Sequence, residues 1–286
     1  AIGLLAGGAG CVVHSVDPDP RPEAADSDEA FSNSPGSPAK PKTGGENWWR
    51  SFGERDLDKL VDTALTENPE VRAGGQRIDQ ANARLVEAGA TLVPQVDGIG
   101  SFRRRWDVDG SRDDSGSIGL LLDWEIDAWG RIRSGRAARA EEVEVAVEDW
   151  RSARLLLTAA VAESCFELVE HRGQLRLSAE QIEVNQTLLD LTKLLVGQGE
   201  SSLVAVLQQQ EQLEYTESRV PDIEARIEAL ELAIESLTGR LPGSGSRNRR
   251  PDEPGVPPPL PKTGFASDLL AERPDLRAQR ARIVAL

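Results

Sequence analysis

The residues most able to do covalent or metal chemistry are few and widely separated in this chain of 286 residues. Histidine occurs only at His14 and His171, and cysteine occurs only at Cys11 and Cys165. Metal sites and nucleophile–base pairs show short ligand spacings or local motifs, such as Gly-x-Ser-x-Gly, and none is found here. We therefore expect no enzymatic activity, no catalytic residue, no metal and no cofactor.

A second set of functional groups is a row of carboxylates at alternate positions, Asp123, Glu125 and Asp127. Side chains of a strand alternate between its two faces, so these carboxylates share one face. The opposite face carries only apolar side chains: Ile118, Leu120, Leu122, Trp124, Ile126 and Ala128. A carboxylate row beside water would favour cations over anions, and this preference would weaken as salt rises.

The charge balance excludes one class of partner. The chain has 33 Lys and Arg against 48 Asp and Glu, which gives a net charge of −15. Binding along nucleic acid needs clustered basic residues that neutralise phosphates, so we expect no nucleic-acid partner. The chain also contains no Met, which leads us to expect a part of a longer product.

The N-terminus predicts a lipid anchor at Cys11. Residues 1–10, AIGLLAGGAG, form the apolar end of a signal peptide, and small residues directly precede the cysteine, as in a bacterial lipobox. Gly8 departs from the usual Leu of that motif, and the alternative is an ordinary secretory peptide with an incidental cysteine. Residues 11–46 are rich in Pro, Asp, Ser and Gly and predict an extended tether.

The body begins with a helical region and continues as two strands. Apolar residues at helical spacing predict helices over 55–92, interrupted at Pro69. Alternation of apolar and polar residues then predicts strands over 95–108 and 117–128. One apolar and one charged face suit a membrane-spanning barrel wall, whereas the alternative is a soluble hairpin packed on a core. No other strand is predicted, so this hairpin needs partners elsewhere.

Two long heptad runs predict a helical hairpin over 136–239. The first seam runs through Val161, Leu168, Leu175, Ile182, Leu189 and Val196, and the second through Val206, Leu213, Val220, Ile227 and Ile234. Gly197, Gln198 and Gly199 supply the turn between them, and two heptad helices joined by a short turn form an antiparallel pair. Pro221 predicts a kink or break in the second helix, and Gly239 predicts its end.

The end of the chain repeats its beginning. After a linker over 241–261, residues 270–283 echo residues 65–78 at a constant offset of 205, which places Pro274 at the position of Pro69. We therefore interpret 47–240 as a first repeat and 262–286 as the truncated start of a second.

These stretches together resemble the first half of a TolC-like outer-membrane efflux protein, in the lipoprotein subgroup that serves resistance-nodulation-division pumps (the NodT/OprM type). The stretches that carry the resemblance are Val16-Asp17-Pro18-Asp19, Trp48-Trp49 with Phe52 and Asp56-Leu57, Ala64-Leu65 with Asn68-Pro69, and 269–278, LLAERPDLRA. In place of an Asp that the family often has near the helical tip, this chain has Ala205, which argues against an acidic constriction from this repeat.

The resemblance implies a mainly α fold with a transmembrane β-hairpin, in which long helices form a tunnel and strands join a trimeric outer-membrane β-barrel. It implies a passive conduit for drugs or other small molecules, lipid-anchored in the outer membrane of a Gram-negative bacterium and extending into the periplasm. Asp123, Glu125 and Asp127 would line the pore, and Ile118, Leu120, Leu122, Trp124 and Ile126 would face lipid. The tip residues Gly197, Gln198, Gly199, Ser201 and Ser202 would contact a periplasmic adaptor that links the homotrimer to an inner-membrane pump.

The alternative function is a periplasmic adaptor or structural coiled-coil lipoprotein, which also combines a lipid anchor with a helical hairpin. This alternative predicts no strand pair with a charged face. It also predicts solubility without detergent once Cys11 is replaced, whereas a channel still needs detergent.

Overall fold

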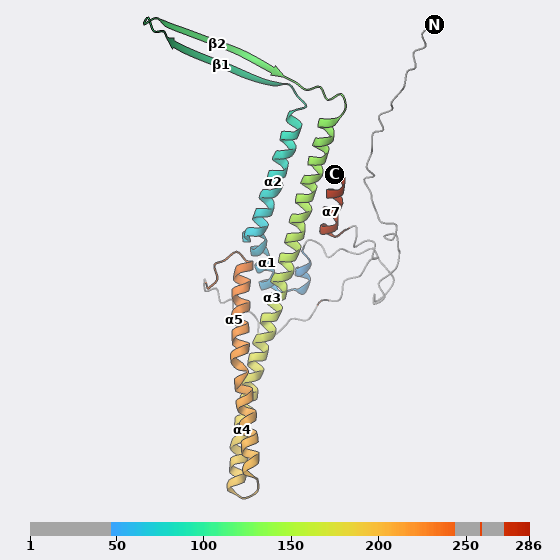
Figure 1. Cartoon of the computed structure of the whole chain (residues 1–286). Helices are drawn as coiled ribbons and strands as arrows, with labels where there is room; N and C mark the ends of the chain where they lie inside the picture. Colours follow the sequence, from blue (N-terminus) through green and yellow to red (C-terminus); the bar gives the residue numbers. More distant parts are fainter. Residues whose placement is uncertain (1–46, 244–257, 259–271) are drawn as a thin grey trace, which may run out of the picture. The chain divides into compact units, whose positions relative to one another are not determined.

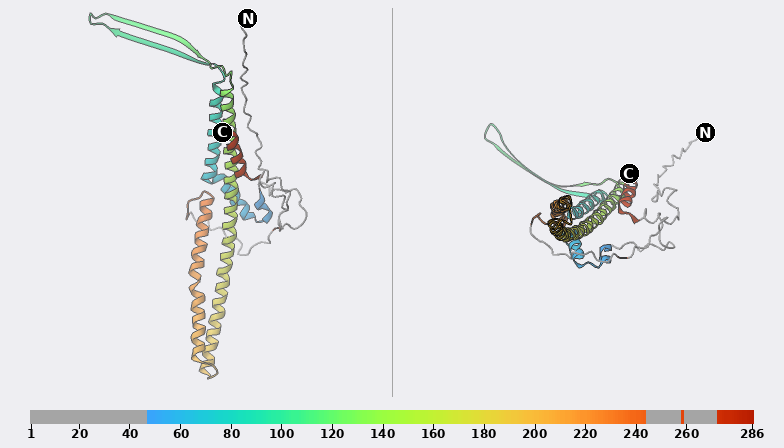
Figure 2. Two further views of the ribbon diagram at one scale, coloured as in Figure 1. Left: turned by 45° about the vertical axis from the view of Figure 1, so that its right-hand side comes forward. Right: turned by 90° about the horizontal axis from the view of Figure 1, so that it is seen from below.

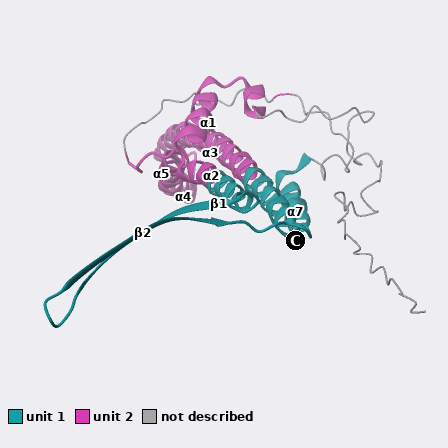
Figure 3. Cartoon of the chain, turned by 90° about the horizontal axis from the view of Figure 1, so that it is seen from above, with its two compact units in different colours: residues 1–31, 77–149, 265–286 teal, residues 32–76, 150–264 magenta. Residues whose placement is uncertain are grey.

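The computed structural model describes residues 47–243, 258 and 272–286, and it divides the chain into two compact units (Figure 3). The described residues of unit 1 are 77–149 and 272–286, and those of unit 2 are 47–76, 150–243 and 258. The fold is mainly helical with long helices and one β-hairpin, which confirms the predicted fold class.

Unit 2 opens with three short elements that supply one side of its core. They are the 3-10 helix η2 (Trp48–Phe52), helix α1 (Arg55–Glu67) and the first turns of α2 (Pro69–Ala90). Leu57, Leu60, Val61 and Ala64 are buried at helical spacing, so α1 is amphipathic. It ends at Asn68 because a residue before proline is driven to extended geometry.

Asn68 joins three helices at this boundary. Its Oδ1 accepts hydrogen bonds from the backbone N–H groups of Glu70 (2.8 Å) and Val71 (3.3 Å), which caps the start of α2. Its Nδ2 donates to the carbonyl oxygen of Leu237 at the end of α5, at 3.0 Å. Asn68 is itself buried, so one side chain satisfies groups that would otherwise be desolvated without partners.

The other side of unit 2 is the helical hairpin. Helix α3 (Arg131–Gly197) contributes its residues from Trp150 onward, and α4 (Leu203–Ser218) and α5 (Val220–Leu237) return beside it (Figures 1 and 2). The break at Arg219 comes two residues before Pro221, as predicted. Gly239, with φ of +72°, follows the end of α5 in the left-handed conformation that glycine tolerates.

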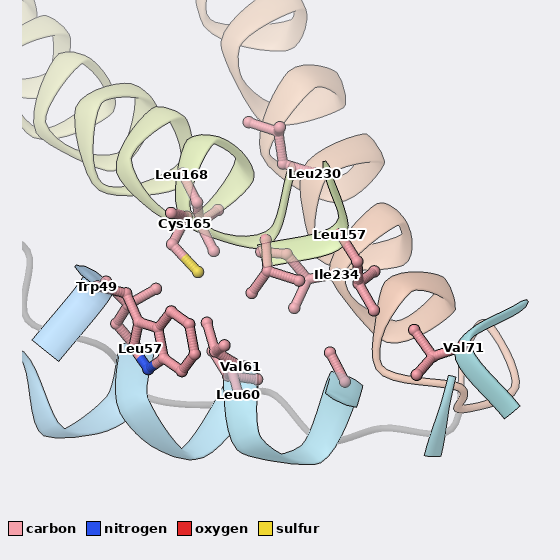
Figure 4. Packing of buried hydrophobic residues seen from close by; sticks show 13 residues of the cluster. Trp49, Leu57, Leu60, Val61, Val71, Leu157, Cys165, Leu168, Leu230 and Ile234 are labelled. Atoms are coloured by element: carbon pink, nitrogen blue, oxygen red, sulfur yellow. The ribbon is translucent and has the colours of Figure 1, made fainter. Parts of the chain in front are cut away.

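One buried apolar cluster holds these elements together (Figure 4). It comprises Trp49, Leu57, Leu60, Val61, Ala64 and Val71 from the opening elements, Leu157, Val161, Ala162, Cys165 and Leu168 from α3, and Leu230 and Ile234 from α5. Val161, Leu168 and Ile234 lie on the predicted heptad seams, so those seams face this core. Cys165 is buried within this cluster.

The far part of the hairpin has a smaller cluster and polar cross-links. Leu189 packs with Val206 and Leu213. Nearby, the side chain of Asn185 donates to the hydroxyl of Thr216 at 3.0 Å. This direct hydrogen bond between α3 and α4 holds the two helices in register.

Unit 1 contains the later part of α2, the hairpin of β1 (Gln95–Trp106) and β2 (Arg112–Asp123), the first part of α3, and α7 (Pro274–Ala285). Helix α7 contacts α3 through ion pairs from Arg277 to Glu148 (2.8 Å) and from Arg282 to Asp149 (2.7 Å). It begins at Pro274 just as α2 begins at Pro69, which matches the predicted 205-residue offset.

Three elements have boundaries that differ clearly from the predicted ones. The second strand spans 112–123 rather than 117–128, and the first ends at Trp106 rather than at residue 108. A tight turn over 107–111 brings residues 112–116 into pairing with β1. Strand β2 ends at Asp123 because its partner, Gln95, is the first residue of β1 and directly follows Pro94. Helix α3 starts at Arg131 rather than at 136, because Asp127 accepts a hydrogen bond from the N–H of Arg133 in its first turn.

Across the part of the chain that the structure describes, every helix is too short or too polar to cross a membrane.

Candidate functional site: an amphipathic strand pair and a helical tip

The pairing of β1 with β2 brings both apolar rows to the same face. The strands are antiparallel, with Val96 opposite Leu122, Gly98 opposite Leu120, and Gly100 opposite Ile118. Side chains of directly opposed residues lie on the same side of a sheet. We call this side the apolar face; it comprises Val96, Gly98, Gly100, Phe102, Arg104, Trp106, Arg112, Asp114, Gly116, Ile118, Leu120 and Leu122.

Residues on the apolar face are fitted to one another across the strands. Each large side chain in the middle of the face lies opposite a glycine, as with Leu120 and Gly98. The ring of Phe102 lies over Gly116, where an added Cβ would approach its Cδ2 at 3.8 Å. An aromatic ring that covers a cross-strand glycine stabilises pairing, so this contact supports the strand pair although both strands are exposed.

The opposite side, which we call the polar face, carries Gln95, Asp97, Ile99, Ser101, Arg103, Arg105, Asp113, Ser115, Ser117, Gly119, Leu121 and Asp123. The hydroxyl groups of Ser101 and Ser117 form a hydrogen bond across the strands at 2.9 Å. Two apolar residues, Ile99 and Leu121, interrupt the polar row. Asp123, one of the predicted pore residues, ends β2 on this face.

Both faces of the strand pair are exposed. Every residue of β1 and β2 is exposed, including Ile118 at 97% and Leu120 at 81% of their full surface. In Figure 1 the two strands form a ribbon of their own. The soluble alternative, a hairpin packed on a core, is therefore not what the described residues form, and the apolar face is left for another partner.

Glu125 and Asp127, the other two predicted pore residues, lie beyond the end of β2 and contact the start of α3. The Nη2 of Arg131 lies 2.7 Å from both carboxylate oxygens of Glu125, and this hydrogen bond raises the pKa of Arg131. The backbone N–H of Arg133 donates to Asp127 at 2.9 Å and is the main cause of the lowered pKa of that carboxyl. These carboxylates thus connect strand to helix, and Arg131 and Arg133 are partners that sequence patterns did not single out.

Trp124 and Ile126, predicted to face lipid, lie in the same segment after β2. Both are exposed, and Trp124 donates its indole N–H to the carbonyl oxygen of Leu92 at 3.4 Å. They therefore lie at the base of the hairpin rather than on the strand that was expected to carry them. Ile118, Leu120 and Leu122 remain on the strand and on the apolar face.

The helical tip is a short, capped turn. Gly197 is the last residue of α3, and Gln198, Gly199 and Ser201 form the connection to α4. Gly199 has φ of +81°, and Ser202 caps α4 by accepting a hydrogen bond from the N–H of Ala205 at 3.3 Å. Ala205 thus lies in the first turn of α4, where the resemblance suggested an Asp. The predicted lipidation site, Cys11, lies outside the described residues.

Within the described residues, no group of three or more His, Cys, Asp or Glu side chains is arranged to hold a metal ion. Among the buried polar groups, Asn68 and Thr216 form hydrogen bonds that join helices. The site is therefore defined by its surfaces, the two faces of the strand pair and the exposed helical tip, rather than by a reactive centre.

Long helices with one two-sided strand pair are the architecture of a class of solved outer-membrane channels. The chain superposes on the structure of the outer-membrane channel OprN with a TM-score of 0.74 and 27% identity, covering 94% of this chain and 62% of that one. The model of the family described as outer membrane efflux protein matches residues 60–240, more than half of the chain. The chain belongs to this family of efflux channels, which are not enzymes.

Curated relatives agree over most of this chain. It is 28% identical over 256 residues to the pyoverdine export outer membrane protein OpmQ of Pseudomonas putida, with 84% of this chain and 53% of that protein covered. It is 26% identical over 242 residues to nodulation protein T of Rhizobium leguminosarum, with 83% and 50% covered. The predicted family resemblance is confirmed, and the chain spans about half the length of these relatives.

Proposed function

We propose that this chain supplies one wall segment and one helical hairpin to a trimeric outer-membrane channel that exports small molecules. The observation that carries the proposal is the exposed strand pair, whose apolar and polar sides are separated by the register of pairing. A strand with lipid on one side and water on the other requires this separation. Membership in the outer membrane efflux family supports the same assignment.

The dimensions of the strands fit a bilayer. Each strand has 12 residues, and at about 3.3 Å per residue it is about 40 Å long. A tilt of about 40° reduces this to about 30 Å along the membrane normal, enough for an apolar band about 25 Å tall. Trp106 lies at the turn end of the apolar face, and Trp124 directly follows β2 at the opposite end. Barrel walls carry aromatic residues at both membrane boundaries in the same way.

Two strands alone do not make a stable membrane structure. The outer edges of β1 and β2 would leave backbone N–H and C=O groups without partners in lipid, at a cost of several kcal/mol for each such group. Further strands must therefore pair with both edges. A homotrimer in which each protomer adds this pair and a second pair from its second repeat would close a twelve-stranded barrel, as the family resemblance suggests.

The polar face supplies the water side of the wall. Asp123 is on this face, and Glu125 and Asp127 follow at its base, where we place the periplasmic mouth of the barrel. Because Glu125 and Asp127 contact Arg131 and Arg133, Asp123 carries more of the proposed cation preference. That preference should weaken as the salt concentration rises.

The helical hairpin would line the periplasmic tunnel, and its tip residues 197–202 would contact a periplasmic adaptor joined to an inner-membrane pump. The pump would supply the energy, and the channel would be a passive conduit. Lipidation of Cys11 would anchor the chain at the outer membrane. The relative OpmQ is named for export of pyoverdine, which supports small organic molecules as cargo.

Labelling of neighbouring residues tests the proposal. The full-length protein with Cys165→Ala would carry a single new cysteine at Leu122 or Asp123 and be reconstituted into lipid vesicles. A membrane-impermeant maleimide should label the Asp123→Cys protein and leave the Leu122→Cys protein at the background of the Cys165→Ala parent. Equal labelling of both positions would contradict the proposal.

The adaptor alternative is disfavoured by the strand pair, which it does not predict. Detergent dependence separates the two functions directly. The full-length Cys11→Ala protein should still require detergent if the apolar face meets lipid. A monodisperse protein in buffer without detergent would support the adaptor instead.

A further inference from the structure

The outer end of the apolar face carries charges that a purely lipid-facing wall would lack. The last two cross-strand pairs on this face before the turn are Arg104 with Asp114 and Trp106 with Arg112. Under the proposed function these residues face the membrane at the end of the hairpin farthest from the helices. Arg or Lys on a barrel's lipid face costs about 2–4 kcal/mol at the bilayer midplane and about 0–1 near the boundary. The charges therefore mark the level of the outer headgroups.

The two arginines share a single carboxylate. The Nε and Nη2 of Arg104 donate to Asp114 Oδ1 and Oδ2 at 2.7 and 3.1 Å, a bidentate contact. Arg112 also donates to Asp114 Oδ2. Two guanidinium groups against one carboxylate leave an excess of one positive charge on this part of the apolar face. Ten N–H donors in the two groups also exceed what one carboxylate accepts.

Aromatic rings hold both guanidinium groups at the surface of the sheet. The guanidinium carbon of Arg104 lies 5.5 Å from the centre of the Phe102 ring, and that of Arg112 lies 5.9 Å from the centre of the Trp106 ring. Such cation–π contacts restrict a side chain that would otherwise be mobile. Two oriented guanidinium groups beside apolar rings match a ligand that has an anionic head and acyl chains.

We propose that Arg104 and Arg112 bind the phosphate of an anionic lipid in the outer leaflet, with the acyl chains lying along Phe102, Ile118 and Leu120. This inference rests on the proposed function, because it requires the apolar face to meet the membrane. A planar guanidinium group binds phosphate through two parallel hydrogen bonds, which is why arginine serves here better than lysine. Asp114 keeps the two groups together until the phosphate joins them.

The polar face provides a matched control. Arg103 and Arg105 lie in the same part of β1 but on the opposite side, where Ser115 and Asp113 are their cross-strand neighbours. The double variants R104Q/R112Q and R103Q/R105Q remove the same charge at nearly the same level. Only the first removes it from the side that faces lipid.

The experiment measures lipid retained by the full-length trimer. Protein would be reconstituted in phosphatidylcholine nanodiscs that contain bisphosphorylated lipid A, repurified in detergent, and analysed for bound lipid A by mass spectrometry. We expect R104Q/R112Q to retain at least about tenfold less than the parent, because charge-assisted hydrogen bonds to the phosphate are lost. R103Q/R105Q should match the parent. Equal loss in both variants, or no loss in the first, would overturn the site.

Further arms identify the ligand. The parent protein should retain lipid A that lacks both phosphates only weakly, at the level at which R104Q/R112Q retains the phosphorylated form. If the parent retains both lipids equally, phosphate recognition is overturned. Millimolar inorganic phosphate should leave the lipid bound. Complete displacement of the lipid by inorganic phosphate would assign the site to free phosphate instead. R104K/R112K keeps the charge without the planar group, so we expect intermediate retention and normal trimer assembly.

Failure of this inference can be distinguished from failure of the proposed function. The Leu122 and Asp123 labelling described above would be done in the same preparations. Asymmetric labelling with unchanged lipid retention in R104Q/R112Q refutes the lipid site alone. Symmetric labelling refutes the membrane wall and the lipid site together.

Discussion

Two leucines show how differently this chain uses apolar residues. Leu168 of α3 is 2% exposed within the core of unit 2, whereas Leu120 of β2 is 81% exposed in unit 1. The helical region buries its apolar seams within the chain, and the strand pair buries neither of its faces. The helical region is therefore stabilised largely by its own contacts, whereas under the proposed function the strand pair would need lipid and further strands.

The backbone explains why the two regions differ. A helix satisfies its own N–H and C=O groups, so it can be completed by side-chain packing with two or three neighbouring helices. A strand satisfies its backbone only through neighbouring strands. The backbone of the strand pair therefore depends on neighbouring strands. The stability of the helical region depends on contacts within this chain, so substitutions in this chain can test it.

The largest expected effect comes from making the same substitution in both regions. Leu168→Ala should lower the free energy of unfolding by about 2–5 kcal/mol, because it leaves a cavity in a packed core. Leu120→Ala should change the unfolding of the helices by less than about 0.5 kcal/mol. Denaturant unfolding of the full-length protein, followed by the helical circular dichroism signal, measures both. Similar losses would remove the contrast between the regions.

Adding a charge tests the two faces of the strand pair. Leu120 and Leu121 are neighbours on the apolar and polar faces. Leu120→Arg should destabilise the inserted state by about 2–4 kcal/mol if it lies near the bilayer midplane. Leu121→Arg should be tolerated, because under the proposed function this side chain would meet water. The yield of assembled trimer in outer-membrane fractions is the measurement, and a loss confined to Leu121→Arg would reverse the assignment of the faces.

Two adjacent glycines sharpen the contrast in packing density. A Cβ added at Gly74 would lie 2.6 Å from Cδ1 of Trp150, whose indole N–H donates to the carbonyl oxygen of Val71 at 3.0 Å. Gly74→Ala should therefore destabilise by about 1–3 kcal/mol through overpacking. Gly75 has no atom within 4 Å of such a Cβ, so Gly75→Ala should stabilise α2 by about 0.5–1 kcal/mol. Thermal unfolding of the two variants should shift in opposite directions; shifts of the same sign would contradict the close approach at Gly74.

The smallest expected effect is a pH dependence at the base of the hairpin. The N–H of Arg133 lowers the pKa of Asp127, so the ionised carboxyl is favoured in the folded state. This contribution is present above the unfolded pKa of about 3.9 and is lost as pH falls through the lower folded value. Amide exchange at Arg133, corrected for intrinsic pH dependence, should become faster below about pH 4. Asp127→Asn should abolish this pH response; a response that persists would place its origin elsewhere.

Much of the local structure could be predicted from the residue pattern. The heptad seam at Val161 and Leu168 correctly indicated the buried side of α3, and the break near Pro221 follows from the lost backbone donor of proline. The apolar row at Ile118, Leu120 and Leu122 lies on one face of β2 as expected. These features depend on neighbours within a few residues in the sequence.

The wrong boundaries depended on contacts between residues of different segments. Residues 112–116 join β2 because the turn at 107–111 sets the register, and Arg104 then meets Asp114. Neither Arg131 nor Arg133 stood out in the pattern, although each lies only six residues from its carboxylate partner. A fixed spacing of opposite charges gives no signal when the intervening backbone changes from strand to helix.

By itself, the sequence determined the spacing at which apolar residues recur, which is two residues in the strands and about three and a half in the hairpin helices. This spacing determines which side of each element is apolar. Side-chain direction follows from local backbone geometry, so no distant contact was needed. Only the tertiary structure decided that both apolar rows share one face, that Arg104 and Arg112 share Asp114, and that Asn68 reaches Leu237. Those facts depend on how separate segments are aligned in space, which the period of a single segment does not specify.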